Sequence, residues 1–204
     1  MRDRAGTAVL WFVIAAALLP GAAWGQPAIS VGEPLPSLGP TLRPMDGTTV
    51  SPRSLGGEEA TVFLFWSDRC PWVDRYESRV DSLAATYGDQ GVRFVLVNAN
   101  DATERPPETP EPRLRTPDRG TGLPYVRDPE ARLARTLGAT RTPHAFVFGE
   151  DWTLRYSGAI DDSPSTPDAV EHTYLRNVVQ ALVSDREVST APQTAFGCTL
   201  NPPE

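Results

Sequence analysis

The chain has 204 residues, no lysine, 19 arginines, 26 acidic residues and two cysteines, so its formal net charge is -7 and its length suits one or two domains. The arginines are scattered, which argues against nucleic-acid binding because neutralising phosphates requires grouped basic side chains. Two cysteines are too few for a disulfide-dense scaffold or for the four ligands of a structural zinc site.

The N-terminal stretch, residues 1–25, carries the pattern of a signal peptide. An apolar run covers residues 8–19, and Ala23 and Gly25 stand at the two positions that a signal peptidase reads. The run is shorter than the roughly 20 residues that a membrane-spanning helix needs. We therefore expect cleavage before Gln26, no transmembrane segment afterwards, and export to the periplasm or the extracellular space, where a disulfide persists. The alternative is an uncleaved N-terminal membrane anchor that leaves the protein facing outside.

The rest of the chain is predicted to form one domain, residues 26–187, followed by an irregular tail, residues 188–204. An Asp46-Gly47 turn signal beside β-favouring residues predicts a short hairpin in front of the main fold. Continuous apolar runs predict buried strands, and apolar residues that recur every three or four positions predict helices. In chain order these are a strand at 60–66, a helix at 72–87, a strand at 92–97, a short helix from Asp128-Pro129 to Leu137, strands at 145–148 and 153–157, and a helix from Thr166-Pro167 to Leu182. The stretch 101–120 is crowded with proline and charge and indicates a long surface loop.

Cys70 is the first candidate for a reactive group. It follows the strand at 60–66, and Pro71 occupies the favoured first position of the next helix, so Cys70 stands about where that helix has its N-cap. Unpaired backbone N–H groups and the positive end of the helix dipole favour thiolate over thiol there. Arg69 adds positive charge, which Asp74 partly opposes. The alternative is a buried structural cysteine or one half of a structural disulfide.

A second feature lies at Thr142-Pro143, between a helix and a strand, where an X-Pro bond is a candidate cis peptide. The order of elements, the Phe-Trp-Ser-Asp-Arg-Cys-Pro sequence at 65–71 and the Arg-Thr-Pro-His-Ala-Phe-Val-Phe sequence at 141–148 together resemble the thioredoxin fold. The likeness is to its redoxin and peroxiredoxin-like branch (alkyl hydroperoxide reductase / thiol-specific antioxidant).

The resemblance extends from about residue 31 to residue 200. The Val-Gly-Glu-Pro sequence at 31–34, the Tyr-Ser-Gly-Ala-Ile-Asp-Asp sequence at 156–162 and a tail with Gly-Cys are similar to an exported subgroup of that branch. It implies an α/β, thioredoxin-like fold: a central mixed β-sheet flanked by helices, with an N-terminal β-hairpin extension and an irregular C-terminal tail.

The same resemblance implies an enzyme, a thiol-dependent antioxidant oxidoreductase in which Cys70 attacks a peroxide or a protein disulfide. Such a protein needs a thiol electron donor and no organic cofactor. The Cys-Pro-Trp-Val sequence at 70–73 lacks the second cysteine of a Cys-x-x-Cys motif, so the chemistry uses one cysteine or a distant partner. In the peroxiredoxin pattern Pro-x-x-x-Thr-x-x-Cys, Phe63 replaces the proline and Ser67 the threonine. Ser67 keeps a hydroxyl that can bind peroxide, whereas Phe63 loses the proline that shapes a peroxidase pocket.

Cys198, in the tail, is the candidate partner of Cys70. On the functional interpretation it is a resolving cysteine on a mobile tail that attacks a sulfenic acid or a mixed disulfide at Cys70. A static disulfide that holds the tail, or a free thiol, is the alternative.

Besides Ser67 and Arg69, four residues are predicted to assist Cys70. Thr142 and Pro143 would present a backbone edge to the substrate, and Arg141, like Arg69, could favour the thiolate. His144 could donate a proton to Cys70, and the alternative is a surface histidine.

Two other functions stay open on the sequence. The first is a thiol-disulfide exchange factor for exported proteins. The second is a non-catalytic thioredoxin-fold module with a structural Cys70–Cys198 disulfide, in which Cys70 and His144 bind Cu(I). No other metal site is expected.

Overall fold

A computed structural model describes residues 28–203 except 40, 45, 68 and 102–122. The predicted signal peptide and nearly all of the predicted loop at 101–120 lie outside these residues. In the part of the chain that is described, no helix is both long enough and apolar enough to cross a bilayer.

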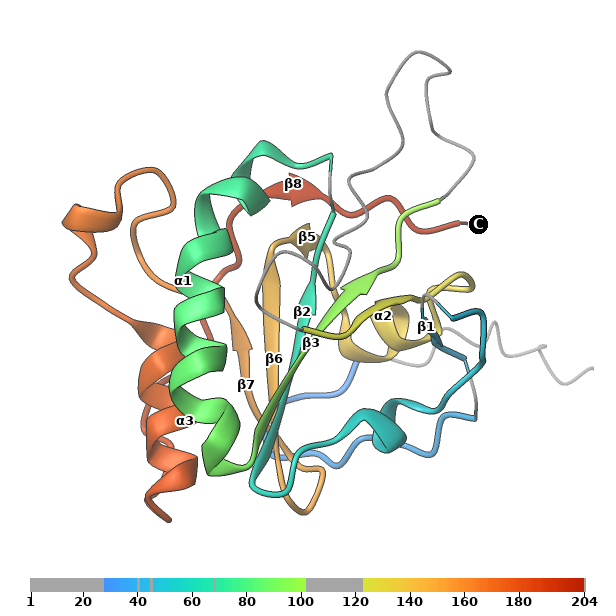
Figure 1. Ribbon diagram of the computed structural model, residues 1–204, viewed down its shortest axis with the longest axis horizontal. Coiled ribbons are helices and arrows are strands. Elements are labelled where there is room, and N and C mark those ends of the chain that lie inside the picture. Colours follow the sequence, from blue (N-terminus) through green and yellow to red (C-terminus); the bar gives the residue numbers. More distant parts are fainter. Residues whose placement is uncertain (1–27, 40, 45, 68, 102–122, 204) are drawn as a thin grey trace, which may run out of the picture.

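The centre of the fold is a six-stranded mixed sheet (Figure 1). Across the sheet its strands are β1 (Arg43–Pro44), β4 (Tyr125–Arg127), β3 (Val92–Asn98), β2 (Ala60–Phe65), β6 (His144–Gly149) and β7 (Leu154–Gly158). β2 runs parallel to β3 and antiparallel to β6, and every residue of β2 is buried. The long apolar strands thus lie where the sequence places them, and the predicted mixed α/β architecture is confirmed.

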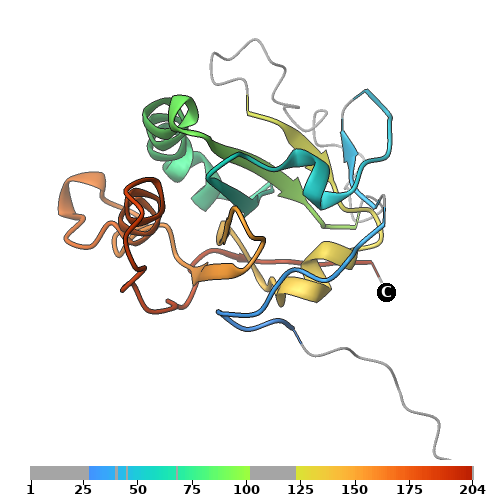
Figure 2. The same cartoon turned by 90° about the horizontal axis from the view of Figure 1, so that it is seen from below.

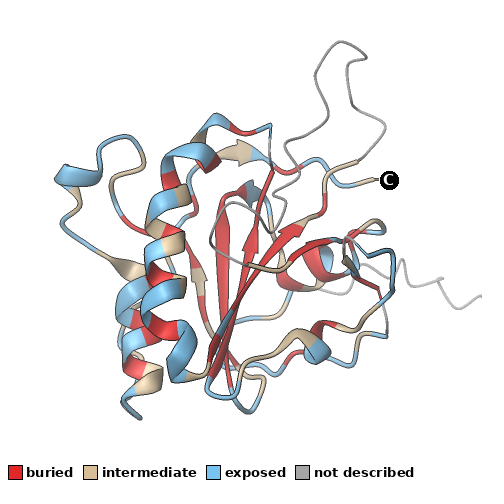
Figure 3. Cartoon of the chain, in the orientation of Figure 1, coloured by how far each residue is buried: buried red, intermediate tan, exposed pale blue. Residues whose placement is uncertain are grey.

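Helices cover both faces of this sheet (Figure 2). The helices α1 (Pro71–Tyr87) and α3 (Tyr174–Val183) pack on one face, and α2 (Arg132–Leu137) packs on the other with the N-terminal segment. The buried side of α1 is its predicted apolar stripe, namely Val73, Tyr76, Val80, Leu83 and Tyr87. Buried residues accordingly gather in the central strands and on the inner sides of the helices (Figure 3). Short 3-10 helices lie at η1 (Pro52–Leu55), η2 (Gly88–Gln90) and η4 (Pro167–Ala169).

The start of α2 differs from the prediction. Residues from Asp128 form a turn, and the helix begins only at Arg132, after Ala131 in the left-handed region with φ 48°. The Asp128 carboxylate still caps the helix, because it accepts the backbone N–H groups of Arg132 at 3.0 Å and Ala134 at 2.9 Å. Asp128 therefore stabilises the first turn from outside the helix.

The start of the last helix also differs. Thr166-Pro167 opens only η4, and α3 begins at Tyr174. Between them the backbone bonds to the loop after β7: the Asp162 N–H donates to the His172 carbonyl at 3.2 Å, and the Glu171 N–H donates to the Asp162 carboxylate at 3.1 Å. Because these tertiary hydrogen bonds replace helical ones, a continuous helix cannot form here.

The two ends of the described chain are attached to the domain. The predicted hairpin is confirmed by two backbone hydrogen bonds between Leu42 and Val50. The tail, predicted to be irregular and mobile, has little regular structure but contacts the domain. Its strand β8 (Cys198–Thr199) pairs antiparallel with β5 (Arg141–Thr142), and further upstream the Gln193 N–H donates to the Ser157 carbonyl at 3.2 Å.

Candidate active site

Cys70 is the N-cap residue of α1, as the sequence predicts. β2 ends at Phe65, and the turn that follows is closed by the Cys70 N–H, which donates to the Ser67 carbonyl at 3.0 Å. Pro71 is the first helical residue, and the Val73 N–H donates back to the Cys70 carbonyl at 2.9 Å. Cys70 is only 2% exposed. Its sulfur therefore lies at the positive end of a 17-residue helix and is shielded from solvent.

Cys70 and Cys198 form a disulfide across 128 residues, with their Cα atoms 5.9 Å apart. Of the three alternatives for Cys198, a free thiol is thus excluded in this state. Figure 1 shows why the two cysteines meet: the tail runs past the start of α1, where β8 lies next to β5.

The predicted cis peptide bond between Thr142 and Pro143 is confirmed. Thr142 is the residue opposite Cys198 in the β5–β8 pair. The Cys70 Sγ lies 3.1 Å from the Thr142 carbonyl oxygen, a close contact in the disulfide that would become a hydrogen bond from the thiol after reduction. The two sulfurs and the cis-proline loop thus form one compact site.

Two tail residues before Cys198 complete this site, and sequence reasoning gave neither of them a role. Gly197 has φ +156°, and a Cβ built on it would lie 2.1 Å from the Thr142 carbonyl oxygen. The Phe196 ring contacts the Trp72 ring edge-on, with centroids 4.7 Å apart, and the Arg75 guanidinium lies 5.4 Å from the Trp72 ring centroid. The signal that could have found them is the Phe-Gly-Cys sequence itself, an aromatic residue and a glycine directly before a cysteine.

The predicted polar helpers lie around the site in different ways. The Ser67 side chain is buried in the turn before Cys70, and its Oγ accepts the Arg69 N–H at 3.4 Å. Arg141 is exposed, and its guanidinium donates to the Thr199 Oγ1 at 3.0 Å, so it binds the tail. Arg69 is exposed in the same turn as Ser67.

His144 does not join Cys70. It is the β6 partner of Phe65 and lies against Phe146, with ring centroids 4.3 Å apart and the rings tilted by 33°, on the α2 side of the sheet. Cys70 belongs to the core cluster on the α1 side. Because alternate strand residues face opposite sides, the predicted Cys70–His144 pairing, for proton transfer or for Cu(I), is wrong in this structure. The prediction of a surface histidine is also wrong, since His144 is buried.

Burial determines the chemistry of His144. Its Nε2 lies 3.2 Å from the Ser157 Oγ, and its Nδ1 is buried without a hydrogen-bond partner among the described residues. Loss of hydration disfavours the charged imidazolium and lowers the pKa of His144 to about 4. The side chain is therefore neutral near pH 7.

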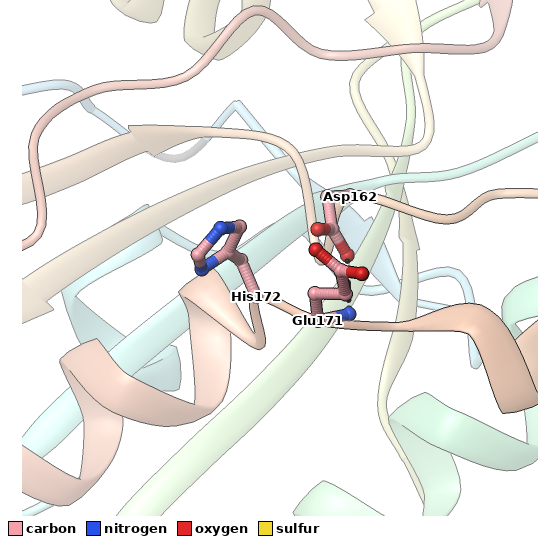
Figure 4. A group of neighbouring side chains, drawn as sticks. All are labelled: Asp162, Glu171 and His172. Atoms are coloured by element: carbon pink, nitrogen blue, oxygen red, sulfur yellow. Dashed lines mark hydrogen bonds between the residues drawn. The ribbon is translucent and has the colours of Figure 1, made fainter.

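A separate polar cluster lies in the loop before α3 (Figure 4). Asp162, Glu171 and His172 are all exposed, and their potential ligand atoms lie within 4.8 Å of one another. Backbone hydrogen bonds, from His172 first, lower the pKa of the Asp162 carboxyl. These bonds hold the loop, and the cluster is remote in sequence from the cysteine pair.

The chain is similar to known proteins in sequence and in structure. The thiol-disulfide oxidoreductase ResA of Halalkalibacterium halodurans is 31% identical over 111 residues, which are 53% of this chain and 58% of that protein. The chain thus spans little more than half the length of this curated relative.

Among solved structures, a hypothetical protein of Sinorhizobium meliloti is 28% identical with a TM-score of 0.74, covering 86% of this chain and 96% of the other. A thioredoxin-like protein in its oxidized form has a TM-score of 0.54 at 20% identity, covering 78% of this chain and 100% of the other, which shows the fold. The family model described as Redoxin matches residues 30–178. The chain therefore belongs to the Redoxin family and has a thioredoxin-like fold.

Proposed function

We propose that the protein is a thiol-disulfide oxidoreductase that acts on protein thiols or disulfides through the Cys70–Cys198 pair. The observation that carries the proposal is the disulfide itself, which joins a cysteine at a helix N-terminus to a cysteine paired with Thr142 beside the cis-proline. The name of the ResA relative supports the same activity over the matched part of the chain.

The exchange proceeds in two balanced steps. When the pair is reduced, the Cys70 thiolate attacks a substrate disulfide, a mixed disulfide forms, and one substrate thiolate leaves. The Cys198 thiolate then attacks the Cys70 sulfur, forms the Cys70–Cys198 disulfide, and releases the second substrate thiolate. The substrate gains two electrons, and solvent supplies its two protons. A dithiol donor returns the pair to the reduced form by the reverse sequence.

We infer that the two cysteines have different tasks in this scheme. Cys70 lies at the N-terminus of α1, which stabilises a thiolate as nucleophile or as leaving group. Cys198 lies on a two-residue strand at the end of a largely irregular tail, so it can move away while a substrate occupies Cys70.

Mass spectrometry of intact protein tests the proposal. Reduced protein is mixed with a peptide that contains one disulfide. We expect the wild type to lose two hydrogens as Cys70–Cys198 forms, Cys198→Ser to accumulate a mixed disulfide at Cys70, and Cys70→Ser to form neither product. Absence of a mixed disulfide in folded Cys198→Ser would falsify the proposal.

Peroxide reduction is the second candidate, because the Ser67 hydroxyl is buried in the turn next to Cys70. The Cys70 thiolate would break the O–O bond, take one oxygen as sulfenic acid and release hydroxide, and Cys198 would then displace water to form the disulfide. Phe63, where the peroxidase pattern has proline, packs in the core against Phe148 and argues against this activity. Ser67→Ala distinguishes the two activities. If the protein reduces peroxide, this variant is oxidised more slowly by hydrogen peroxide but at an unchanged rate by a peptide disulfide.

We also propose that the protein works outside the cytoplasm. The apolar run at 8–19 and the cleavage pattern before Gln26 support export, and a disulfide is stable in an oxidising compartment. Sequencing the N-terminus of the protein from its native cells should give Gln26. A start at Met1 would exclude cleavage and favour the membrane-anchored alternative.

A further inference from the structure

We propose that tail residues 195–200 are an internal copy of the polypeptide that this site receives. The substrate class is then an extended segment in which an aromatic residue stands two positions before the exchanging cysteine and a glycine stands one position before it. This inference rests on the proposed function and adds the substrate class and a competitor for it.

Main-chain pairing is the first observation. β8 pairs with β5 in the register Arg141 opposite Thr199 and Thr142 opposite Cys198, and the Leu200 N–H donates to the Thr140 carbonyl at 3.0 Å. An extended polypeptide that adds a strand to an exposed edge gains such bonds whatever its sequence. The tail therefore occupies a strand-binding edge, and it places a cysteine at Cys70.

The position before the cysteine is restricted to glycine. Gly197 lies directly over the Thr142-Pro143 bond, where an added Cβ would be 2.1 Å from the Thr142 carbonyl oxygen and 3.1 Å from the Pro143 Cδ. Its φ of +156° is also rare for any residue with a side chain. A substrate that binds in the same register meets the same backbone atoms, so the site selects glycine here.

Trp72 contacts the side chain that stands two positions before the cysteine. Phe196 is 49% exposed and lies edge-on against the Trp72 ring at 4.7 Å, on an indole that Arg75 covers as well. A half-exposed phenylalanine contributes little to the core, and its main described contact belongs to the site. Trp72 is therefore a subsite for an aromatic side chain.

Tail and substrate exclude each other. With the tail in place Cys70 is 2% exposed, and the β5 edge is already paired. A polypeptide substrate reaches Cys70 only after the disulfide is reduced and residues 195–200 leave the edge. The tail thus competes with every substrate that the reduced protein binds.

The experiment uses the full chain carrying Cys198→Ser, in which a mixed disulfide at Cys70 is trapped. The probe is the symmetric disulfide of an end-blocked peptide with the sequence of residues 194–200, Thr-Ala-Phe-Gly-Cys-Thr-Leu. The Cys70 thiolate takes one peptide into a mixed disulfide and releases the other as a thiol. Intact mass gives the equilibrium constant. We expect the peptide with alanine for phenylalanine to be captured about threefold to tenfold less, and the peptide with alanine for glycine at least about tenfold less.

Replacing the same glycine by alanine in the protein, rather than in the peptide, should raise the capture of peptide at Cys70. Gly197→Ala in the Cys198→Ser background weakens the competing tail, so capture of the unchanged peptide rises. Gly88→Ala is the matched control, because a Cβ there meets nothing within 4 Å, and it leaves capture unchanged. Equal capture of all three peptides, or no rise with Gly197→Ala, overturns the inference.

Oxidised glutathione separates this failure from that of the proposed function. If Cys70 takes glutathione into a mixed disulfide but captures the three peptides equally, the thiol-disulfide activity stands and the recognition of the tail sequence is wrong. If Cys70 reacts with neither glutathione nor any peptide, both proposals are overturned.

Discussion

Among the contacts of helix α1 with later described parts of the chain, two attachments differ in kind. At its N-terminus, Cys70 is bonded to Cys198, and Phe196 contacts Trp72 at the surface. This attachment consists of one disulfide, a two-residue strand pair and a half-exposed aromatic contact. Reduction breaks its only covalent bond.

The second attachment lies further along the helix and is a buried polar network. The Arg79 guanidinium lies 2.5 Å from the Asp161 carboxylate, and the Tyr76 hydroxyl donates to the same carboxylate at 3.2 Å. The Ser163 N–H adds a third hydrogen bond to Asp161. Reduction does not break these hydrogen bonds or this ion pair. Separating Arg79 from Asp161 would leave a buried charge unpaired. The comparison therefore indicates that reduction allows the tail to leave the site while the body of the domain stays intact.

The largest expected effect is that of the disulfide on global stability. Reduction, or Cys198→Ser, should lower the free energy of unfolding by about 5 kcal/mol, because the bond closes a loop of 128 residues in the unfolded chain. Urea unfolding of oxidised, reduced and Cys198→Ser protein measures it, and the last two should coincide. Loss of the native circular dichroism on reduction alone would contradict a purely local release.

Breaking the second attachment should cost less but should do so in both redox forms. Asp161→Ala leaves Arg79 without its buried partner and should destabilise the protein by about 3 kcal/mol. An exposed carboxylate in the same loop supplies the control, since Asp168→Ala should change stability by under about 1 kcal/mol. If the effect of Asp161→Ala depended on the state of the disulfide, the two attachments would be coupled and the comparison would fail.

The sequence predicts the body of the domain, with its central sheet and α1, better than it predicts where the tail lies. β2 and α1 follow from a continuous apolar run and an apolar stripe, because these patterns reflect burial within one element. Cys70 and the cis bond before Pro143 follow from local chemistry as well. β4 was not predicted, since three residues are too few to show a period.

Features that depend on contacts between distant segments could not be predicted in the same way. The β5–β8 pair joins two strands of two residues each, which carry no pattern of their own. The face of the sheet on which His144 lies depends on the register that pairs it with Phe65. A shift of that register by one residue would move His144 to the opposite face. The start of α3 was misplaced because Asp162 bonds to the backbone of residues 171 and 172.

His144 provides a pH test of whether the body stays packed. Its pKa is lowered from 6.5 to about 4 in the folded protein, so the fold favours the neutral form. That contribution to stability is complete above the unfolded pKa of 6.5 and is lost as the pH falls from 6.5 toward 4. From this group alone, the free energy of unfolding should fall by about 2 kcal/mol between pH 6.5 and pH 5.

Two measurements isolate this effect. His144→Gln should remove that part of the pH dependence. The difference between the free energies of unfolding of variant and wild type, followed against pH, measures it. NMR titration of the His144 ring should give a pKa of about 4 in the oxidised and in the reduced protein alike. A rise toward 6.5 on reduction would mean that the α2 side of the sheet opens together with the tail.

The smallest expected effect concerns the tail alone. Phe196→Ala removes an edge-on aromatic contact of about 1 kcal/mol that exists only while the tail lies on the site. Since this contact stabilises the oxidised form more than the reduced one, in which no covalent bond holds the tail on the site, the variant should be easier to reduce, with a reduction potential higher by up to about 20 mV. Equilibration with glutathione buffers measures the shift. The control is Val31→Ala, which trims the other exposed large hydrophobic residue of the described chain and should leave the potential unchanged. An unchanged potential in Phe196→Ala would mean that Trp72 does not hold the tail, and that pairing with β5 and the disulfide position it unaided.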